Sequence, residues 1–418
     1  MIKTPATMQD RSTLRARLRS IFPAPFGWHA RYMLGAYLRD TFLVMSVVLV
    51  VALSIDFVSY LGKVIAAVHG EAILRGAVII AWYAGVRSVD KIAEFLPFAI
   101  FFGVFLTEIR HTISKERLIV LISGRAPLQC LAPLIWFALL MVAIELFLIV
   151  YLRPAAVMNQ STSHLGEYGE EYDRGQISER KWIIAGNDLI HARINFSAPP
   201  RLLDVRIFRN DGDHHLREIV DARSATPTEK EGFWIVEDGQ RHLVKPEPSA
   251  AGADAQKPSQ PIEATVETSF QRALIAVKID PFWVRYFGIP VKFLPIDVFR
   301  RLGEAHFQPD AEYRTWAQAR FSIPIVAGGM ALLAGSLCLI LLAGEIRVPV
   351  LLFVGGCGFA AHTLTTLFVL MGDHGWIHPL LAGWLIPALI LACPFAVHRL
   401  TKRQRSWLRT GESAIVST

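Results

Sequence analysis

Long apolar runs alternate with polar stretches along this chain, and their lengths predict its fold class. A helix of about 20 apolar residues crosses the hydrocarbon core of a bilayer. The apolar runs are Thr41–Leu61, Phe95–Thr107, Pro127–Leu152, Phe321–Ala343, Val348–Met371 and Ile377–Val397. Phe95–Thr107 is short, but the helical pattern of Ala84–Glu94 ahead of it lengthens it. The pattern predicts an α-helical membrane protein with six transmembrane helices.

The polar stretch from Arg153 to Arg320 separates the third apolar run from the fourth and has a different pattern. Short runs rich in β-branched and aromatic residues alternate there with turn-forming residues. These runs are Trp182–Ile184, Leu189–Ile194, Leu203–Phe208 and Phe233–Val236. They predict an inserted all-β domain, either a β-sandwich or a jelly-roll-like module. Residues Pro246–Pro261, rich in Pro, Ala and Ser, predict a disordered loop within it.

Lysine and arginine residues give the 418-residue chain a formal net charge of +7, and many of them cluster at three places. These clusters precede the first apolar run, separate the second run from the third, and follow the last. Their members are Arg11, Arg15, Arg17, Arg19, Arg31, Arg39, Arg110, Lys115, Arg117, Arg125, Lys402, Arg403, Arg405 and Arg409. Because cytoplasmic loops carry such an excess, all three places and both termini are predicted to be cytoplasmic. The charge therefore indicates topology rather than nucleic-acid binding, and the polar stretch faces outward.

The cysteines and the known short motifs predict no cofactor, metal or disulfide. Cys130, Cys338, Cys357 and Cys393 lie in or beside apolar runs, with no metal-ligand spacing among them. No Walker A, HExxH or GxSxG motif occurs, so an ATP-driven function would require a separate ATPase subunit. The first apolar run is too long and too far from the start for a cleaved signal peptide, which predicts a retained anchor.

Several short segments, taken in order, resemble one family of membrane proteins. They are Arg31-Tyr32, Ile55–Val58, Leu61–Lys63, Phe95–Ala99, Ser114–Leu118 with Gly124, Leu216–Glu218, Trp234, Asp238-Gly239, Pro295–Asp297 and His378–Pro387. Together with three crossings on each side of an outward β domain, they resemble the lipopolysaccharide-export permeases of the LptF/LptG type, with a slight lean to the LptG type. Lys115 and Arg117 flank Glu116 where the family's pattern has Ser and Leu.

This resemblance implies a transport subunit without enzymatic activity of its own. It implies a heterodimer of paralogous permeases driven by a cytoplasmic ATPase dimer. The complex would extract lipopolysaccharide from the inner membrane and pass it to periplasmic bridge proteins. The implied organisation is a cytoplasmic basic arm (1–30), helices 1–3 (31–152) with a coupling segment (111–125), a periplasmic β domain (153–310), helices 4–6 (311–400) and a cytoplasmic tail (401–418).

The candidate substrate-binding residues are Lys63, Asp56 and Arg75. Lys63 is expected at the outward end of the first helix, where an ammonium suits the phosphates of lipid A; the alternative is ordinary snorkelling of a helix-end lysine. Asp56 is expected to act structurally rather than by touching substrate, with Lys63 as one possible partner. Arg75, together with Arg87 and Lys91, could form a basic rim, but solvated loop charge is the favoured interpretation for each.

The candidate ATPase-coupling residues are Glu116, Leu118, Leu121 and Gly124. A short helix here could insert apolar residues into a groove of the ATPase while Glu116 pairs with a basic residue. The alternative is an amphipathic surface helix between two crossings, which would have the same pattern.

Two other functions remain open from the sequence. One is a membrane-anchored scaffold or sensor of the envelope. The other is a secondary transporter, for which Glu145 in the third crossing is the only supporting intramembrane carboxylate. Glycines in the fourth and fifth crossings, Gly328, Gly329 and Gly358 among them, are expected to serve helix packing.

Overall fold

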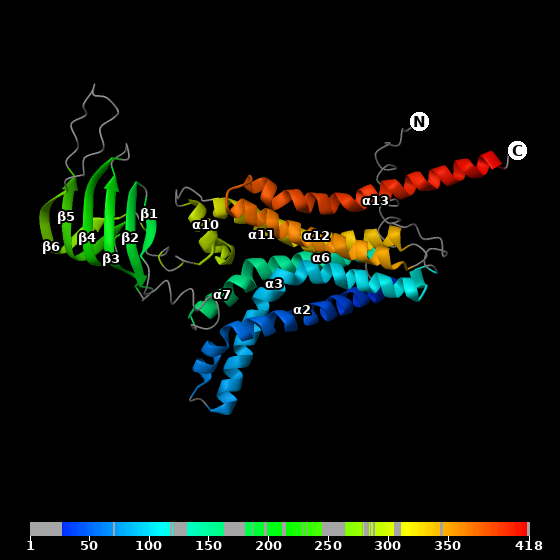
Figure 1. The fold of residues 1–418 in the computed structure, drawn as a ribbon, viewed down its shortest axis with the longest axis horizontal. Coiled ribbons are helices and arrows are strands. Elements are labelled where there is room, and N and C mark those ends of the chain that lie inside the picture. Colours follow the sequence, from blue (N-terminus) through cyan, green and yellow to red (C-terminus); the bar gives the residue numbers. More distant parts are fainter. Residues whose placement is uncertain are drawn as a thin grey trace, which may run out of the picture. The chain divides into compact units, whose positions relative to one another are not determined.

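The computed structural model in Figure 1 describes two compact units of the chain. The described residues are 27–69, 72–117, 119, 132–162, 311–342 and 346–415, together with most of 180–244 and 264–304. One unit comprises Met1–Val157 with Pro309–Thr418, and the other comprises Met158–Gln308. The Pro246–Pro261 loop and most of the N-terminal arm lie outside the described residues.

The first unit is a bundle of long apolar helices. They are α2 (Trp28–Val68), α3 (Ile73–Ile113), α6 (Ala132–Phe147), α11 (Ala311–Leu341), α12 (Val348–Asp373) and α13 (Pro379–Ile415). Helix α6 continues through the short π-helix η1 (Leu148–Leu152) into α7 (Arg153–Thr162), whose last residues belong to the second unit. Six spans among the described residues are long and apolar enough to cross a membrane. The prediction of six spans is therefore confirmed.

Helix α3 is longer than the sequence pattern indicated. The helical pattern of Ala84–Glu94 was expected to lengthen the second crossing, but the helix begins earlier, at Ile73, and is continuous with that crossing. The first part of α3 was missed because Arg75, Arg87 and Asp90 interrupt the apolar pattern without ending the helix. Helices α2 and α3 therefore form an antiparallel hairpin, and Figure 1 shows its joined end reaching beyond the other helices of the bundle.

Helix α11 lies at the centre of the bundle and packs against α3, α6, α12 and α13. Its glycines allow this close approach: a Cβ on Gly328 would lie 3.0 Å from the carbonyl oxygen of Ala138 in α6, and one on Gly329 would lie 2.9 Å from Ile390 in α13. On α12, a Cβ on Gly358 would overlap the Phe101 ring of α3. Small residues let membrane helices pack backbone to backbone, which confirms the packing role expected for these glycines.

Helices α2 and α12 are the least covered helices of the bundle. Only 17% of the membrane-crossing window of each is buried within the chain. Large apolar side chains project from both, among them Phe42, Val50, Ile55, Val58, Leu352, Phe353 and Phe359. Such faces need lipid or another apolar surface against them.

The second unit contains one six-stranded antiparallel sheet whose strands follow in sequence order. The strands are β1 (Lys181–Ala185), β2 (Asp188–Asn195), β3 (Arg201–Asn210), β4 (Leu216–Pro227), β5 (Phe233–Val244) and β6 (Ala264–Ala276). Strands β4 and β6 were not expected, because charged residues break the apolar alternation in both. Helix α10 (Ile296–Glu304) follows later in this unit.

One face of the sheet carries the apolar core of this unit. Ile190 on β2, Val220 on β4 and Val236 on β5 are fully buried there, as is Trp234 at 1% exposure. The Trp234 indole Nε1 donates a hydrogen bond to the carbonyl oxygen of Ile279 at 3.1 Å. Residues 277, 279 and 284 belong to the same cluster, so the segment after β6 covers the apolar face.

We expect the α2–α3 contact to be intolerant of a methyl group at Gly103. A Cβ there would overlap the backbone of Thr41 in α2, whereas a Cβ on Gly85, in the same helix, would meet nothing within 4 Å. Gly103→Ala should lower stability by about 1–3 kcal/mol through overpacking. Gly85→Ala should be neutral or stabilise by about 0.5–1 kcal/mol through helix propensity. Thermal unfolding of the purified protein in detergent measures both, and equal midpoints would contradict the packing described.

Candidate functional site

A chain of charged side chains is buried where the α2–α3 hairpin meets the start of α7. Asp56 comes from α2, Arg87 and Asp90 from α3, and Arg153 from α7; each is at most 9% exposed. Charged groups inside a membrane bundle are rare and are retained where they pair or serve function. This cluster, which we call the buried ion network, is therefore the first candidate site.

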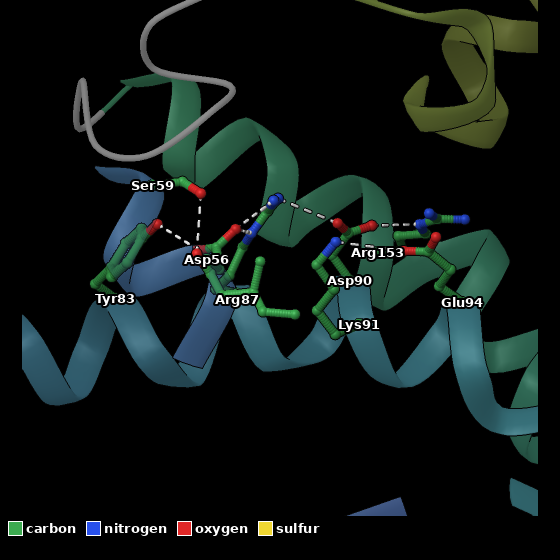
Figure 2. Close-up of polar contacts among 9 residues, drawn as sticks. Asp56, Ser59, Tyr83, Arg87, Asp90, Lys91, Glu94 and Arg153 are labelled. Carbon is green, nitrogen blue, oxygen red and sulfur yellow. Dashed lines mark hydrogen bonds and ion pairs between the residues drawn. The ribbon is translucent and has the colours of Figure 1, made fainter. Parts of the chain in front are cut away.

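Figure 2 shows the contacts of the buried ion network. Asp56 accepts a hydrogen bond of 2.7 Å from the Tyr83 hydroxyl and one of 2.7 Å from Arg87 Nε. Arg87 also reaches Asp90 through Nη1 at 3.2 Å. Arg153 Nε donates to the other Asp90 oxygen at 2.7 Å. Two arginines and two aspartates alternate, so the charges cancel within the network.

The π-helix η1 directly precedes Arg153. It occupies Leu148–Leu152 between α6 and α7. A single π turn holds one residue more than an α turn, which changes the direction of every side chain after it, and such turns are frequent at functional sites. Arg153 thereby faces Asp90 of α3 although it follows a long apolar helix.

Two expectations from the sequence, on Arg87 and on Asp56, can be compared with these contacts. Arg87, interpreted as solvated loop charge, is instead 2% exposed and lies within α3, so that interpretation is wrong. The described partners of Asp56 are Tyr83 and Arg87. Lys63 belongs to the last turns of α2, its side chain being outside the described atoms, and Arg75 is exposed on the first turn of α3.

A second polar cluster lies at the opposite end of α2 and α3. Glu108 accepts a hydrogen bond of 2.7 Å from the Tyr37 hydroxyl and pairs with Arg117. Asp40, fully buried, pairs with Arg39 and Arg110, both at 2.9 Å. Because Glu108 and Asp40 come from the two different helices, these contacts tie α2 to α3 at this end.

Glu116 is the one candidate coupling residue whose contacts the structure describes. Its carboxylate lies 2.6 Å from His111 Nδ1 and accepts a longer hydrogen bond of 3.4 Å from the Tyr32 hydroxyl. Its side chain is 44% exposed. A cavity of about 350 Å³, lined by Trp28, Met33 and Leu339 among others, opens beside it. Leu118, Leu121 and Gly124 lie outside the described residues.

Glu145 on α6 is a buried charge outside these two clusters. It is fully buried, and neither carboxylate oxygen has a hydrogen-bond partner among the described residues. The described residues also contain no group of His, Cys, Asp and Glu that could hold a metal ion. Cys338, Cys357 and Cys393 are free thiols.

These features define a polytopic membrane protein in which an antiparallel sheet is inserted into a bundle of apolar helices. The family model for the lipopolysaccharide export system permease LptF/LptG matches residues 31–399. The chain belongs to this family, and it is thus a multi-pass inner-membrane permease of lipopolysaccharide transport. Among curated proteins, none matches the chain. The lean to the LptG type stays a prediction, because the family model covers both types.

Sequence reasoning missed Tyr83, Asp90 and Arg153 as members of the site. A signal was present: Arg87 and Asp90 are spaced i,i+3 within a segment of helical pattern, which places them on one helix face. The contribution of Arg153 could not be found in this way, because it depends on the π turn.

We expect Arg87→Met to destabilise the protein far more than Lys91→Met. Arg87 is 2% exposed between two aspartates, and removing one partner of a buried pair costs about 3–5 kcal/mol. Lys91 lies one turn further along α3 and pairs with Glu94, which is 47% exposed, so its loss should cost about 0–1 kcal/mol. Thermal unfolding in detergent compares the two. Equal losses would mean that the buried ion network does not hold α2 against α3.

Proposed function

We propose that this chain is one of two paralogous permease subunits in an ATP-driven lipopolysaccharide exporter. The observation that carries the proposal is the uncovered apolar face of α2 and α12 in a chain of this family, with 17% of each membrane window buried. A second permease packed near these helices would enclose an apolar cavity for the acyl chains of the lipid. A separate cytoplasmic ATPase dimer would supply the energy, since no Walker A motif occurs in the sequence.

The proposed orientation has both termini in the cytoplasm and the sheet in the periplasm. The positive-inside distribution of Lys and Arg supports it. The arm 1–30, the segment 111–125 and the tail 401–418 would then be cytoplasmic, and 153–310 would form the periplasmic domain. In this proposal the domain has a jelly-roll-like fold and hands the lipid to periplasmic bridge proteins of similar fold.

Lipid phosphates would be bound at the joined end of the α2–α3 hairpin. Lys63, near the end of α2, and Arg75, exposed on the first turn of α3, are the proposed partners of the phosphates. Asp56 is buried and already binds Tyr83 and Arg87. Its proposed part is therefore to hold the two helices in register beneath the binding residues.

Coupling to the ATPase is assigned to Glu116, Leu118, Leu121 and Gly124. The exposed Glu116 carboxylate has a histidine as its closest described partner. A basic residue of the ATPase could replace that contact while Leu118 and Leu121 enter an apolar groove. This division of charged and apolar contacts follows the usual helix-in-groove mode of binding.

One observation favours a second candidate function, a secondary transporter. Glu145 is a fully buried carboxylate without a described partner inside a spanning helix, and proton-coupled transporters carry such groups. Under that function the chain would operate without an ATPase.

Purification in mild detergent from native membranes separates these functions. Recovery of a second permease and a small ATPase with the tagged chain supports the exporter. Recovery of the chain alone, even after crosslinking, would reject it and favour the secondary transporter or a membrane-anchored scaffold.

We expect the charge at Lys63 to control lipid binding. Lys63→Glu should reduce crosslinking of lipopolysaccharide more than Lys63→Gln, because a carboxylate repels the phosphates whereas an amide only removes the attraction. Lys63→Arg, which keeps the charge, is the control and should retain crosslinking. Equal crosslinking in the wild type and in the Glu and Gln variants would refute a phosphate contact.

We expect Glu116→Lys to abolish association with the ATPase while insertion into the membrane continues. The matched control is Glu94→Lys, an equal charge change at a carboxylate 47% exposed halfway along α3. Co-purification of the ATPase measures association, and the yield of membrane-extracted protein measures insertion. If Glu116→Lys and Glu94→Lys retain the ATPase equally, Glu116 is not a coupling residue.

A further inference from the structure

A cleft of about 590 Å³ opens between α2 and α3 at the end where α2 begins. It differs from the cavity beside Glu116 in its charge, because three arginines line it: Arg31 and Arg39 from α2 and Arg110 from α3. Of the proposed coupling residues, Glu116 lines the cleft, whereas neither lipopolysaccharide-binding candidate, Lys63 or Arg75, does. The proposed function assigns no ligand to the three arginines.

The fully buried Asp40 fixes two of the three arginines in place. Its Oδ1 binds Arg39 Nε and Arg110 Nη1, each at 2.9 Å, and its Oδ2 accepts a hydrogen bond of 2.9 Å from Thr107. The outer parts of both guanidinium groups remain in contact with the surroundings, with side-chain exposures of 63% for Arg39 and 46% for Arg110. Asp40 thus orients the arginines without enclosing them.

Arg31 adds a third positive charge to the cleft. It is exposed and forms no ion pair with any described residue. Gly35, one turn further along α2, lines the cleft, and a Cβ there would meet nothing within 4 Å. The cleft also contains two carboxylates, those of Asp40 and Glu116, and Glu116 is paired with His111. Three guanidinium groups against these two carboxylates form a site with spare donors for an anion.

Beyond this cleft, α2 carries a stripe of exposed apolar side chains. Leu38 and Phe42 follow Gly35 at intervals of three and four residues, so they lie on the same side of α2 one and two turns further along. Phe42 is 74% exposed and Leu38 is 37% exposed. A ligand with a charged head in the cleft and a hydrocarbon tail along this stripe would match both parts of the surface.

We propose that this cleft binds the phosphate headgroup of an anionic phospholipid, with Arg31, Arg39 and Arg110 as its ligands and the acyl chains lying along Leu38 and Phe42. Basic pockets between membrane helices on the cytoplasmic side bind anionic lipid headgroups in this way. The site belongs to the cytoplasmic leaflet, an assignment that rests on the orientation given under the proposed function. This lipid is not the transported one, whose proposed contacts, Lys63 and Arg75, lie at the other end of the hairpin.

The test measures how much anionic phospholipid stays with the purified protein. Dioleoyl phosphatidylglycerol is titrated against the protein in detergent, and bound lipid is counted by native mass spectrometry, with dioleoyl phosphatidylcholine as the neutral comparison. The variant Arg31→Gln/Arg39→Gln should lose at least three-quarters of the bound phosphatidylglycerol. Arg31→Lys/Arg39→Lys should retain about half or more, because it keeps both charges but loses the planar donor geometry.

Arg347→Gln is the matched control, since Arg347 is an exposed arginine just before α12 and outside the cleft. Unchanged phosphatidylglycerol binding in the Gln double variant would overturn the proposal. So would loss of ATPase association with lipid binding intact, because the cleft would then be a protein contact. A competition with inorganic phosphate distinguishes a lipid site from a free-phosphate site. If phosphate displaces phosphatidylglycerol only above about 100 mM, where ionic screening alone weakens surface charge contacts, the site binds lipid. If it does so at micromolar concentration, the site binds free phosphate. Binding of the lipid does not require the partner permease, so failure here is distinguishable from failure of the exporter function.

Discussion

The junction of α2, α3 and α7 depends on one constraint: each of the four charges buried there meets an opposite charge. Asp56, Arg87, Asp90 and Arg153 satisfy each other across three helices, and no one of them could be buried alone without a cost of several kcal/mol. This requirement fixes the rotation of α2 against α3 and the direction in which the chain enters α7. The π turn before Arg153 is consistent with the same requirement, because it directs the guanidinium toward Asp90.

The constraint also divides the α2–α3 hairpin into regions of different character. Charged contacts occupy both ends, at Asp56 and at Asp40, while the middle of α2 presents apolar side chains outward. Helix α2 is thus joined to α3 by polar contacts at two places, and the face between them stays free for lipid or for another chain. Helix α12 has no buried charge among its described residues; its membrane window is equally uncovered, and it meets α13 where Gly372 lies against Ala382.

The number of spanning helices followed from hydropathy, because each span needs its own length of apolar residues regardless of its neighbours. The extent of α3 did not, since Arg87 and Asp90 resemble loop charges until their partners on α2 and α7 are known. Likewise β4 was missed because Glu218 and Asp221 face arginines on neighbouring strands, contacts that local alternation does not reveal. Of the candidate site residues, Asp56 and Glu116 were found by their position in the sequence, whereas Tyr83 and Arg153 depend on tertiary contacts.

The buried ion network has an electrical consequence. A unit charge moved across the membrane potential exchanges about 2.3 kcal/mol per 100 mV with the field. Because the two arginines balance the two aspartates, a movement that carries α2, α3 and α7 together displaces no net charge on the network. The membrane potential would then do no net work on these four buried charges, so burying them does not make the position of the helices depend on voltage.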